Sequence, residues 1–120
     1  MLDLLQERVN GDAALVWRGR FVELTFLLGV GDNDWLVTVE KGRITGLERR
    51  RLATESGRFT IRAGADAWAE HWKPVPRRDY HDLFAMLPKG LARIDGDLVA
   101  LMQNLQYYKD VLAAPRQSEA

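Results

Sequence analysis

Hydrophobic residues change their prevailing spacing close to Gly64 in this chain of 120 residues. Ahead of that glycine they alternate with polar residues, so that Val22, Leu24 and Phe26 fall on one side of an extended chain. Beyond it they recur at the helical spacing of about 3.6 residues. A chain that runs through strands first and through helices afterwards predicts an α+β domain, with helices covering one face of a single sheet.

The same patterns predict the order of the elements. Strand-like patterns occur at residues 14–20, 21–29, 35–40, 43–51 and 57–62. We expect about four strands of this region to form an antiparallel meander, and one late strand at 91–95. Helices are expected within the first ten residues and at 65–72 and 80–87. A long last helix begins after Asp97, a residue type that favours the N-cap position. One apolar stripe of this helix consists of Leu98, Leu101, Met102, Leu105, Tyr108, Val111 and Leu112.

Length and charge limit what the chain can be. The length fits one domain, which we place at residues 1–114, followed by a polar tail at 115–120. Lysine plus arginine and aspartate plus glutamate both number 17, so the basic excess typical of a nucleic-acid-binding protein is missing. No apolar run approaches the ~20 residues that a spanning helix needs, so we expect no stable membrane insertion. No signal-like segment is visible, and a cytoplasmic location is expected.

Residues with catalytic or metal-binding chemistry are few and scattered. The chain has no cysteine, which excludes thiolate nucleophiles and cysteine-held metals. The histidines, His71 and His81, stand ten residues apart, which is not the spacing of a helical metal pair, and we expect both on the surface. Asp32 and Asp34 lie among turn-forming residues and indicate a turn rather than a calcium loop. The sequence therefore predicts a protein that is not an enzyme and that holds neither metal nor cofactor.

Basic residues are concentrated in one segment, residues 41–62, which holds seven basic and two acidic side chains. Such a segment could bind a phosphate headgroup or another anionic surface. Alternatively, its charges protect an edge strand from pairing with other sheets. We favour the second interpretation, because no aromatic side chains are interleaved with the peak of the charge, Arg49-Arg50-Arg51.

Aromatic residues and methionines gather in the second half of the chain, among them Trp68, Trp72, Phe84, Met86 and Met102. They can form an ordinary core, or they can form the wall of an apolar cavity between the sheet and the helices. Periodicity does not separate these possibilities, because the same residue types serve both.

Over most of the chain, the order of residues also resembles a known pattern. The matching segments, in chain order, are residues 22–29, residues 35–39, Gly42, Phe59-Thr60-Ile61, Asp66, Trp68, Phe84-Ala85-Met86 and the run from Gly90 through Ile94-Asp95-Gly96-Asp97 into the last helix. No one of these motifs is diagnostic, but their colinear order spans residues 13–113. In that order the chain is similar to the sterol carrier protein type-two family of lipid-binding domains.

The resemblance implies an open, mixed five-stranded sheet with helices over it and a hydrophobic tunnel beneath the last helix. It implies non-catalytic binding of a fatty acyl chain, an acyl-CoA or a sterol, so the expected partner is an apolar small molecule or lipid. Carried over by position, the tunnel would be lined by Leu24, Phe26, Leu28, Val37, Val39, Ile61, Phe84, Leu101, Met102, Leu105 and Tyr108.

Two other functions remain open from the sequence. In the first, the same fold serves as a protein-interaction module: the tunnel is packed solid, Trp72, Tyr107 or Tyr108 is exposed as a patch, and a protein partner or a homodimer is possible. In the second, the chain is a small cone-shaped isomerase-like enzyme that uses Asp66 or Asp82 together with Tyr80. The order of elements argues against the second, because those folds place their helices first and their long strands last.

Overall fold

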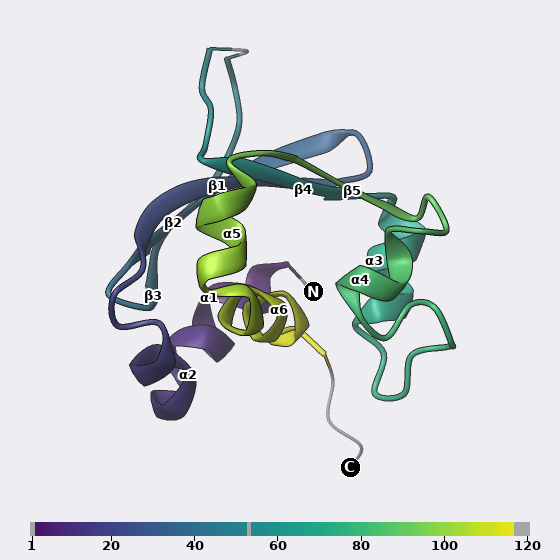
Figure 1. Cartoon of the computed structure of the whole chain (residues 1–120), viewed down its shortest axis with the longest axis horizontal. Helices are drawn as coiled ribbons and strands as arrows, with labels where there is room; N and C mark the ends of the chain where they lie inside the picture. The colour runs from purple at the N-terminus through teal and green to yellow at the C-terminus, as the bar shows by residue number, and fades with distance from the viewer. Residues whose placement is uncertain (1, 53, 117–120) are drawn as a thin grey trace.

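Five strands form one mixed sheet, and the structure, a computed structural model, describes residues 2–52 and 54–116. The strands are β1 (Glu23–Val30), β2 (Asn33–Glu40), β3 (Arg43–Arg49), β4 (Phe59–Ala63) and β5 (Ala92–Gly96). Their order across the sheet is β3-β2-β1-β4-β5 (Figure 1). β1 and β4 run parallel, and the other neighbouring pairs are antiparallel. The expected mixed five-stranded sheet is confirmed, with the polar strand β3 at an edge.

The alternation of apolar residues explains how the strands pair. Leu24 lies opposite Val39, and Phe26 lies opposite Val37, on the antiparallel pair β1–β2. Because side chains alternate along a strand, these residues share one face of the sheet. On the other face the hydroxyl groups of Thr25 and Thr38 are hydrogen-bonded to each other at 3.1 Å. One face of the sheet is therefore apolar, whereas the other is mixed and carries the pair Leu27 and Leu36 as well as the two threonines.

All helices lie on the apolar face of the sheet (Figure 1). They are α1 (Asp3–Asn10), α2 (Ala13–Arg18), α3 (Ala65–His71), α4 (Leu83–Met86), α5 (Leu98–Gln103) and α6 (Leu105–Ala113). In Figure 1 the described residues between β3 and β4, on either side of residue 53, project from the opposite side of the sheet. The single sheet with helices over one face confirms the predicted α+β class.

An aromatic cluster fills the centre of the core between the sheet and α6. Phe26 of β1 and Phe59 of β4 are stacked with their ring centroids 5.2 Å apart. The ring of Tyr108 from α6 meets both of them edge-on, at 5.8 and 5.1 Å. All three side chains are buried. The space in which the sequence predicts a tunnel therefore holds these three rings at its centre.

The strand expected at residues 14–20 is wrong, because this segment forms helix α2. The carboxylate of Asp12 accepts a hydrogen bond from the Leu15 N–H at 3.1 Å and so provides the N-cap. Leu15 is buried, whereas Trp17 is 64% exposed. A short apolar run fits a strand and a helix equally well, and here the cap ahead of the run favours the helix.

We expect Asp12→Ala to lower the free energy of unfolding by about 0.5–2 kcal/mol, the usual contribution of an N-cap side chain. Asp12→Asn serves as the matched control, because asparagine caps helices as well as aspartate does. Urea unfolding followed by circular dichroism measures both variants. Equal losses in the two variants would show that the charge of Asp12, and not its cap, carries the effect.

The prediction of one continuous last helix is also wrong, because a turn at Asn104 divides this segment into α5 and α6. Asn104 has a backbone conformation outside the helical region, with φ −133° and ψ 38°. The turn puts the two helices out of phase, so the predicted stripe does not face the core along its whole length. Leu101 is buried, whereas Leu98 and Met102 are 50% and 56% exposed.

The last described residues are held by the domain. The guanidinium group of Arg116 donates to the carbonyl oxygens of His71 at 2.9 Å and of His81 at 3.2 Å. The sequence places this arginine in a polar tail at 115–120, and its hydrogen bonds show that the tail does not begin before it. Residues 117–120 of that predicted tail lie outside the described residues.

Candidate functional site

A groove opens beside α5, at the edge of the apolar core. We call it the α5 groove, and its volume is about 360 Å³, within the range of small-molecule sites. β1 and the residues just before it form one side, α5 forms the other, and α6 contributes the buried floor. The residues that line it are Phe21, Val22, Glu23, Leu24, Arg58, Asp97, Val99, Ala100, Gln103, Asn104 and Tyr108.

Backbone hydrogen bonds fix the polar end of the α5 groove. The N–H of Arg58 donates to the carbonyl of Thr25 at 2.7 Å, and the N–H of Asp97 donates to the carbonyl of Arg58 at 2.8 Å. The Arg58 guanidinium lies 3.4 Å from the Asp97 carboxylate. The other carboxylate oxygen of Asp97 caps α5 by accepting from the Ala100 N–H at 3.1 Å. The ion pair at this end is thus tied to the start of α5.

Tyr108 is the polar side chain at the buried end of the groove. It is 1% exposed, and its hydroxyl has no hydrogen-bond partner among residues 2–52 and 54–116. Burial raises the pKa of this hydroxyl to about 12, and the nearby Arg58 partly opposes the rise. The hydroxyl therefore stays protonated at neutral pH and can donate a hydrogen bond.

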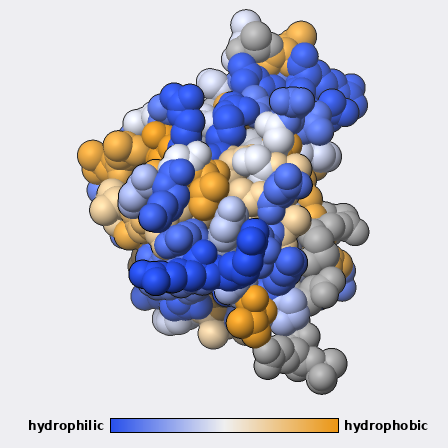
Figure 2. Space-filling model, turned by 90° about the vertical axis from the view of Figure 1, so that its right-hand side faces the viewer, coloured by the Kyte–Doolittle hydropathy of each residue, from blue (hydrophilic) through white to orange (hydrophobic). Residues whose placement is uncertain are grey.

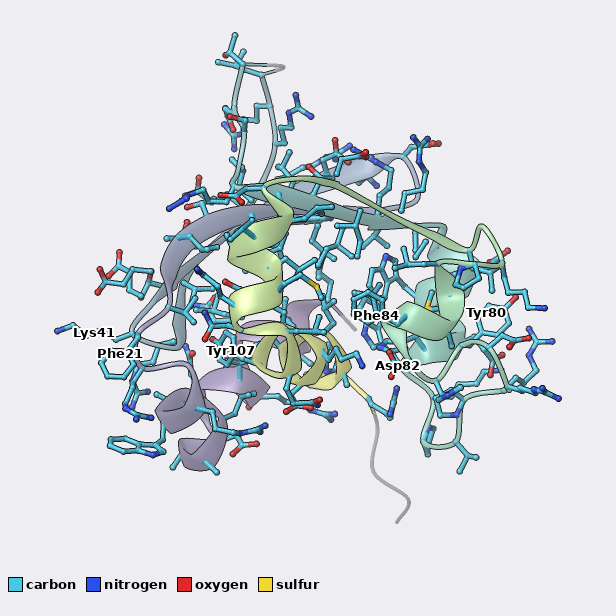
Figure 3. The ribbon with its side chains drawn as sticks, viewed as in Figure 1. Phe21, Lys41, Tyr80, Asp82, Phe84 and Tyr107 are labelled. Atoms are coloured by element: carbon cyan, nitrogen blue, oxygen red, sulfur yellow. The ribbon has the colours of Figure 1, made fainter. Side chains whose placement is uncertain are left out.

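The structure places the predicted tunnel residues in three settings. Leu24 and Tyr108 line the α5 groove, while Phe84 and Leu105 are half-buried and Met102 is exposed. In Figure 3, Phe84 lies with Tyr80 and Asp82 on the α4 side of the molecule, apart from Phe21. The remaining predicted residues are buried in the core: Phe26, Leu28, Val37, Val39, Ile61 and Leu101. Ligand contact by this set stays a prediction.

Sequence patterns do not identify several groove residues. Phe21 has the same strand parity as Glu23 and Thr25, so alternation assigns it to the polar face. Arg58 belongs to the basic segment, whose charges are expected to protect an edge strand. Val99 lies off the predicted helical stripe. These residues lie close together because α5 turns away from α6. No local pattern in the sequence predicts that turn.

The apolar side chains around α5 form an exposed surface. The exposed members are Phe21, Leu98, Val99 and Met102. Figure 2 looks onto the end of the molecule that carries α3 and α4, where hydrophilic residues dominate and an apolar area lies at the left-hand edge. Apolar surface of this kind commonly marks a ligand or partner site.

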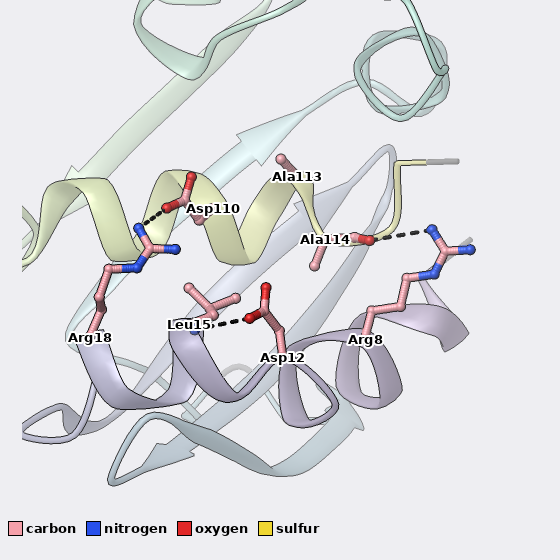
Figure 4. A pocket seen from close by; sticks show the side chains of 7 residues that line it. All are labelled: Arg8, Asp12, Leu15, Arg18, Asp110, Ala113 and Ala114. Atoms are coloured by element: carbon pink, nitrogen blue, oxygen red, sulfur yellow. Dashed lines mark hydrogen bonds and ion pairs between the residues drawn. The ribbon is translucent and has the colours of Figure 1, made fainter. Parts of the chain in front are cut away.

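A second hollow, of about 420 Å³, lies between α1, α2 and α6 (Figure 4). Its charged residues bond within the protein: Arg18 pairs with Asp110, and Asp12 caps α2. Arg8 donates to the carbonyl oxygens of Ala114, Pro115 and Arg116, the last at 2.7 Å. Basic side chains at a helix C-terminus stabilise it in this way. We therefore interpret the residues around this hollow as structural contacts that join α1 and α2 to α6 and the residues after it.

The two histidines border a smaller hollow of about 160 Å³ near α4. His71 is 3% exposed, so its predicted surface position is wrong. Its Nδ1 donates to the carbonyl of Tyr80 at 2.7 Å, which holds the loop after α3. Burial lowers the pKa of His71, so it is neutral at pH 7. Among the described residues, no group of three or more metal-ligating side chains comes together.

The carboxylates considered for an isomerase-like site are in unsuitable surroundings. Asp66 is exposed. Asp82 accepts from Lys109 at 3.0 Å and from the Phe84 N–H at 2.9 Å. Burial alone would raise the pKa of Asp82, but these two hydrogen bonds outweigh it and hold the pKa below its usual value. A general base at neutral pH needs a pKa near 7, so Asp82 is poorly suited to that role.

No helix of the described residues is both long enough and apolar enough to pass through a bilayer. The sequence matches no protein-family model and no curated protein.

Several solved structures, by contrast, superpose on nearly the whole chain. Sterol carrier protein 2 has a TM-score of 0.74 at 17% identity, covering 98% of this chain and 94% of that one. A conserved hypothetical protein from Thermus thermophilus, described as possibly a sterol carrier protein, has a TM-score of 0.65 at 18% identity and coverages of 97% and 86%. The ubiquinone synthesis protein UbiJ-SCP2 has a TM-score of 0.62 at 16% identity and coverages of 98% and 89%. The resemblance seen in the sequence is thus confirmed as a likeness of fold: this chain has the fold of sterol carrier protein 2.

Proposed function

We propose that this protein binds an apolar small molecule or lipid without transforming it, and that the ligand is held in the α5 groove. The observation that carries the proposal is the groove itself, an open space with the apolar side chains of Phe21, Leu24 and Val99 in its walls. Of its polar residues, Arg58 and Asp97 lie together at one end, Tyr108 lies at the buried end, and Glu23, Gln103 and Asn104 also line it. A lining that combines apolar side chains with hydrogen-bonding groups suits a molecule with both an apolar part and a polar part.

The way in which α5 is held supports access to the core. This helix has six residues, and Leu101 is its buried side chain. Elements that bury little apolar surface open locally more readily than the rest of a fold. A ligand in the α5 groove can therefore extend toward Phe26 and Phe59 when α5 moves outward. Such a path would include part of the tunnel that the sequence predicts.

The fold adds general support. The structural neighbours include proteins named as a sterol carrier and as a ubiquinone synthesis protein, and the α5 groove lies on the helix-covered face of the same fold.

A protein-interaction module with a packed interior is the second candidate, and the closely packed rings of Phe26, Phe59 and Tyr108 favour it. The expected exposed patch of Trp72, Tyr107 or Tyr108 is wrong, because all three are buried. Trp17 and Phe21 are exposed instead, and the guanidinium of Arg20 lies 3.9 and 4.7 Å from their ring centroids. In this alternative, that pair contacts the partner.

Native mass spectrometry of the purified protein, followed by solvent extraction, tests the proposal. We expect a bound apolar molecule that is lost on denaturation, or uptake of an added apolar lipid. Ala100→Trp places an indole in the space that the ligand would occupy, and affinity should fall roughly ten- to a hundredfold, which corresponds to about 1.4–2.8 kcal/mol.

Ala69→Trp is the matched control, because Ala69 is exposed on α3 and does not line the groove. Unchanged affinity in Ala100→Trp would place the ligand elsewhere. If the wild-type protein takes up no apolar molecule, the interaction module becomes the better description.

A further inference from the structure

The hydroxyl of Tyr108 is a buried donor without an acceptor. Buried polar groups in folded proteins are nearly always hydrogen-bonded, and an exception calls for an explanation. Tyr107, the preceding residue, follows the rule: its hydroxyl donates to the carbonyl of Gly42 at 2.8 Å. Tyr108 has no such partner among the described residues, although its ring is fixed by Phe26 and Phe59. A fixed ring with a free donor is suited to meet an oxygen that arrives with a ligand.

This donor belongs to the α5 groove. Tyr108 lines the groove together with Arg58, and Arg58 is the charged residue close enough to the hydroxyl to lower its pKa. The ring of Tyr108 comes from α6, whereas Ala100 and Gln103 approach from α5. Because the hydroxyl is buried, a ligand in the groove must displace part of its covering to reach it.

Resting on the proposed function, we propose that the ligand carries an uncharged oxygen, as in an ester, a ketone or an alcohol, and that Tyr108 donates a hydrogen bond to it. The apolar part of the ligand then lies along Phe21, Leu24 and Val99. The class of ligand is an uncharged, oxygen-bearing lipid rather than a free fatty acid.

The charges around the groove favour an uncharged oxygen over a carboxylate. Of the charged residues in its lining, Glu23 and Asp97 are acidic and Arg58 is basic. Arg58 already pairs with Asp97, whose carboxylate also caps α5. A ligand carboxylate would have to share Arg58 with Asp97 and would be repelled by both acids of the lining. An ester or ketone oxygen carries no charge and is not repelled in this way.

Three probes with similar tails test the proposal: methyl laurate, laurate and dodecane. Their affinities are measured at neutral pH by displacement of Nile red from the wild-type protein and from Tyr108→Phe. A neutral hydrogen bond contributes enough that methyl laurate should bind about three- to tenfold more tightly than dodecane. It should also bind more tightly than laurate. Tyr108→Phe should lose the preference for the ester and keep its affinity for dodecane.

The outcomes separate this inference from the proposed function. If none of the probes binds the wild-type protein, both proposals fail. If dodecane binds but the ratio of ester to dodecane affinity is the same in Tyr108→Phe, only the hydrogen bond is disproved. Tighter binding of laurate than of methyl laurate in the wild type would disprove the uncharged oxygen.

A charge reversal on the groove provides an independent test. Glu23→Lys should strengthen laurate binding relative to methyl laurate, because it removes an acid from the groove and adds a cation. Glu48→Lys is the control, because it makes the same change on β3, outside the groove. An equal effect of both variants would mean that the net charge of the protein, and not the groove, sets the preference for the head of the ligand.

Discussion

Phe59→Ala should lower the free energy of unfolding by about 3–5 kcal/mol, the usual cost of removing a buried aromatic side chain. Phe59 is buried on β4, stacked on Phe26 and in edge contact with Tyr108. Truncation removes both contacts and leaves a cavity between the sheet and α6. Because small domains have about 5–15 kcal/mol of total stability, the loss is a large part of the whole.

The measurement is urea unfolding of Phe59→Ala and of a control, Phe84→Ala. Phe84 is half-buried and lies under the ammonium group of Lys109, 5.2 Å from the ring centroid. Its truncation should cost about 1 kcal/mol. A loss in Phe59→Ala no larger than in this control would contradict the assignment of the aromatic cluster as the centre of the core.

The same variant also bears on function. The cavity in Phe59→Ala lies where the sequence predicts a tunnel, so an apolar molecule that fills it should restore part of the lost stability. The wild-type protein, whose rings already occupy this space, should gain less from the same molecule. Thermal unfolding with and without added dodecane compares the two proteins.

Gly42→Ala should lower the free energy of unfolding by about 2–5 kcal/mol, combining a backbone conformation that side chains disfavour with an overpacked site. Gly42 has φ +82° in the tight turn between β2 and β3. A methyl group there would lie 2.4 Å from the carbonyl oxygen of Val16 and 2.9 Å from the backbone of Gly19. These are backbone atoms of the α2 region, so relief requires movement of the chain.

Two other glycines separate the contributions to that loss. Gly90 has φ +71° and open space where a methyl group would lie, so Gly90→Ala should show the conformational part alone, about 1–2 kcal/mol. Gly64 has neither a positive φ nor a close neighbour, so Gly64→Ala should change stability little. Similar losses in Gly42→Ala and Gly90→Ala would show that the contact with α2 contributes nothing.

The sheet could be predicted from the sequence because alternation reports directly on burial. Leu24 and Phe26 flank the polar Thr25, and Val37 and Val39 flank the polar Thr38; Phe26, Val37 and Val39 are buried. The tight turn at Lys41 and Gly42 could likewise be predicted from the sequence, because a glycine in this position allows the positive φ that a short hairpin requires.

The helices were harder to predict from the sequence, because their bounds and directions depend on contacts between residues far apart in the chain. Residues 13–18 are apolar enough for a strand, and only the cap from Asp12 distinguishes the helix. The apolar residues beyond Asp97 keep the helical spacing throughout, and their spacing near Asn104 does not indicate that the helix ends there. The α5 groove results from that break, so its residues could not be selected from spacing alone.

Arg8 has a consequence for the order in which the domain assembles. Its hydrogen bonds reach the carbonyl oxygens of Ala114 and Arg116, more than a hundred positions away in the sequence (separations of 106 and 108). Contacts between such distant residues must await closure of the whole intervening chain, which makes them late events in folding. The hydrogen bonds of Arg8 therefore form only when α6 is in place. We expect the two ends of the described chain to become ordered together, in one cooperative step.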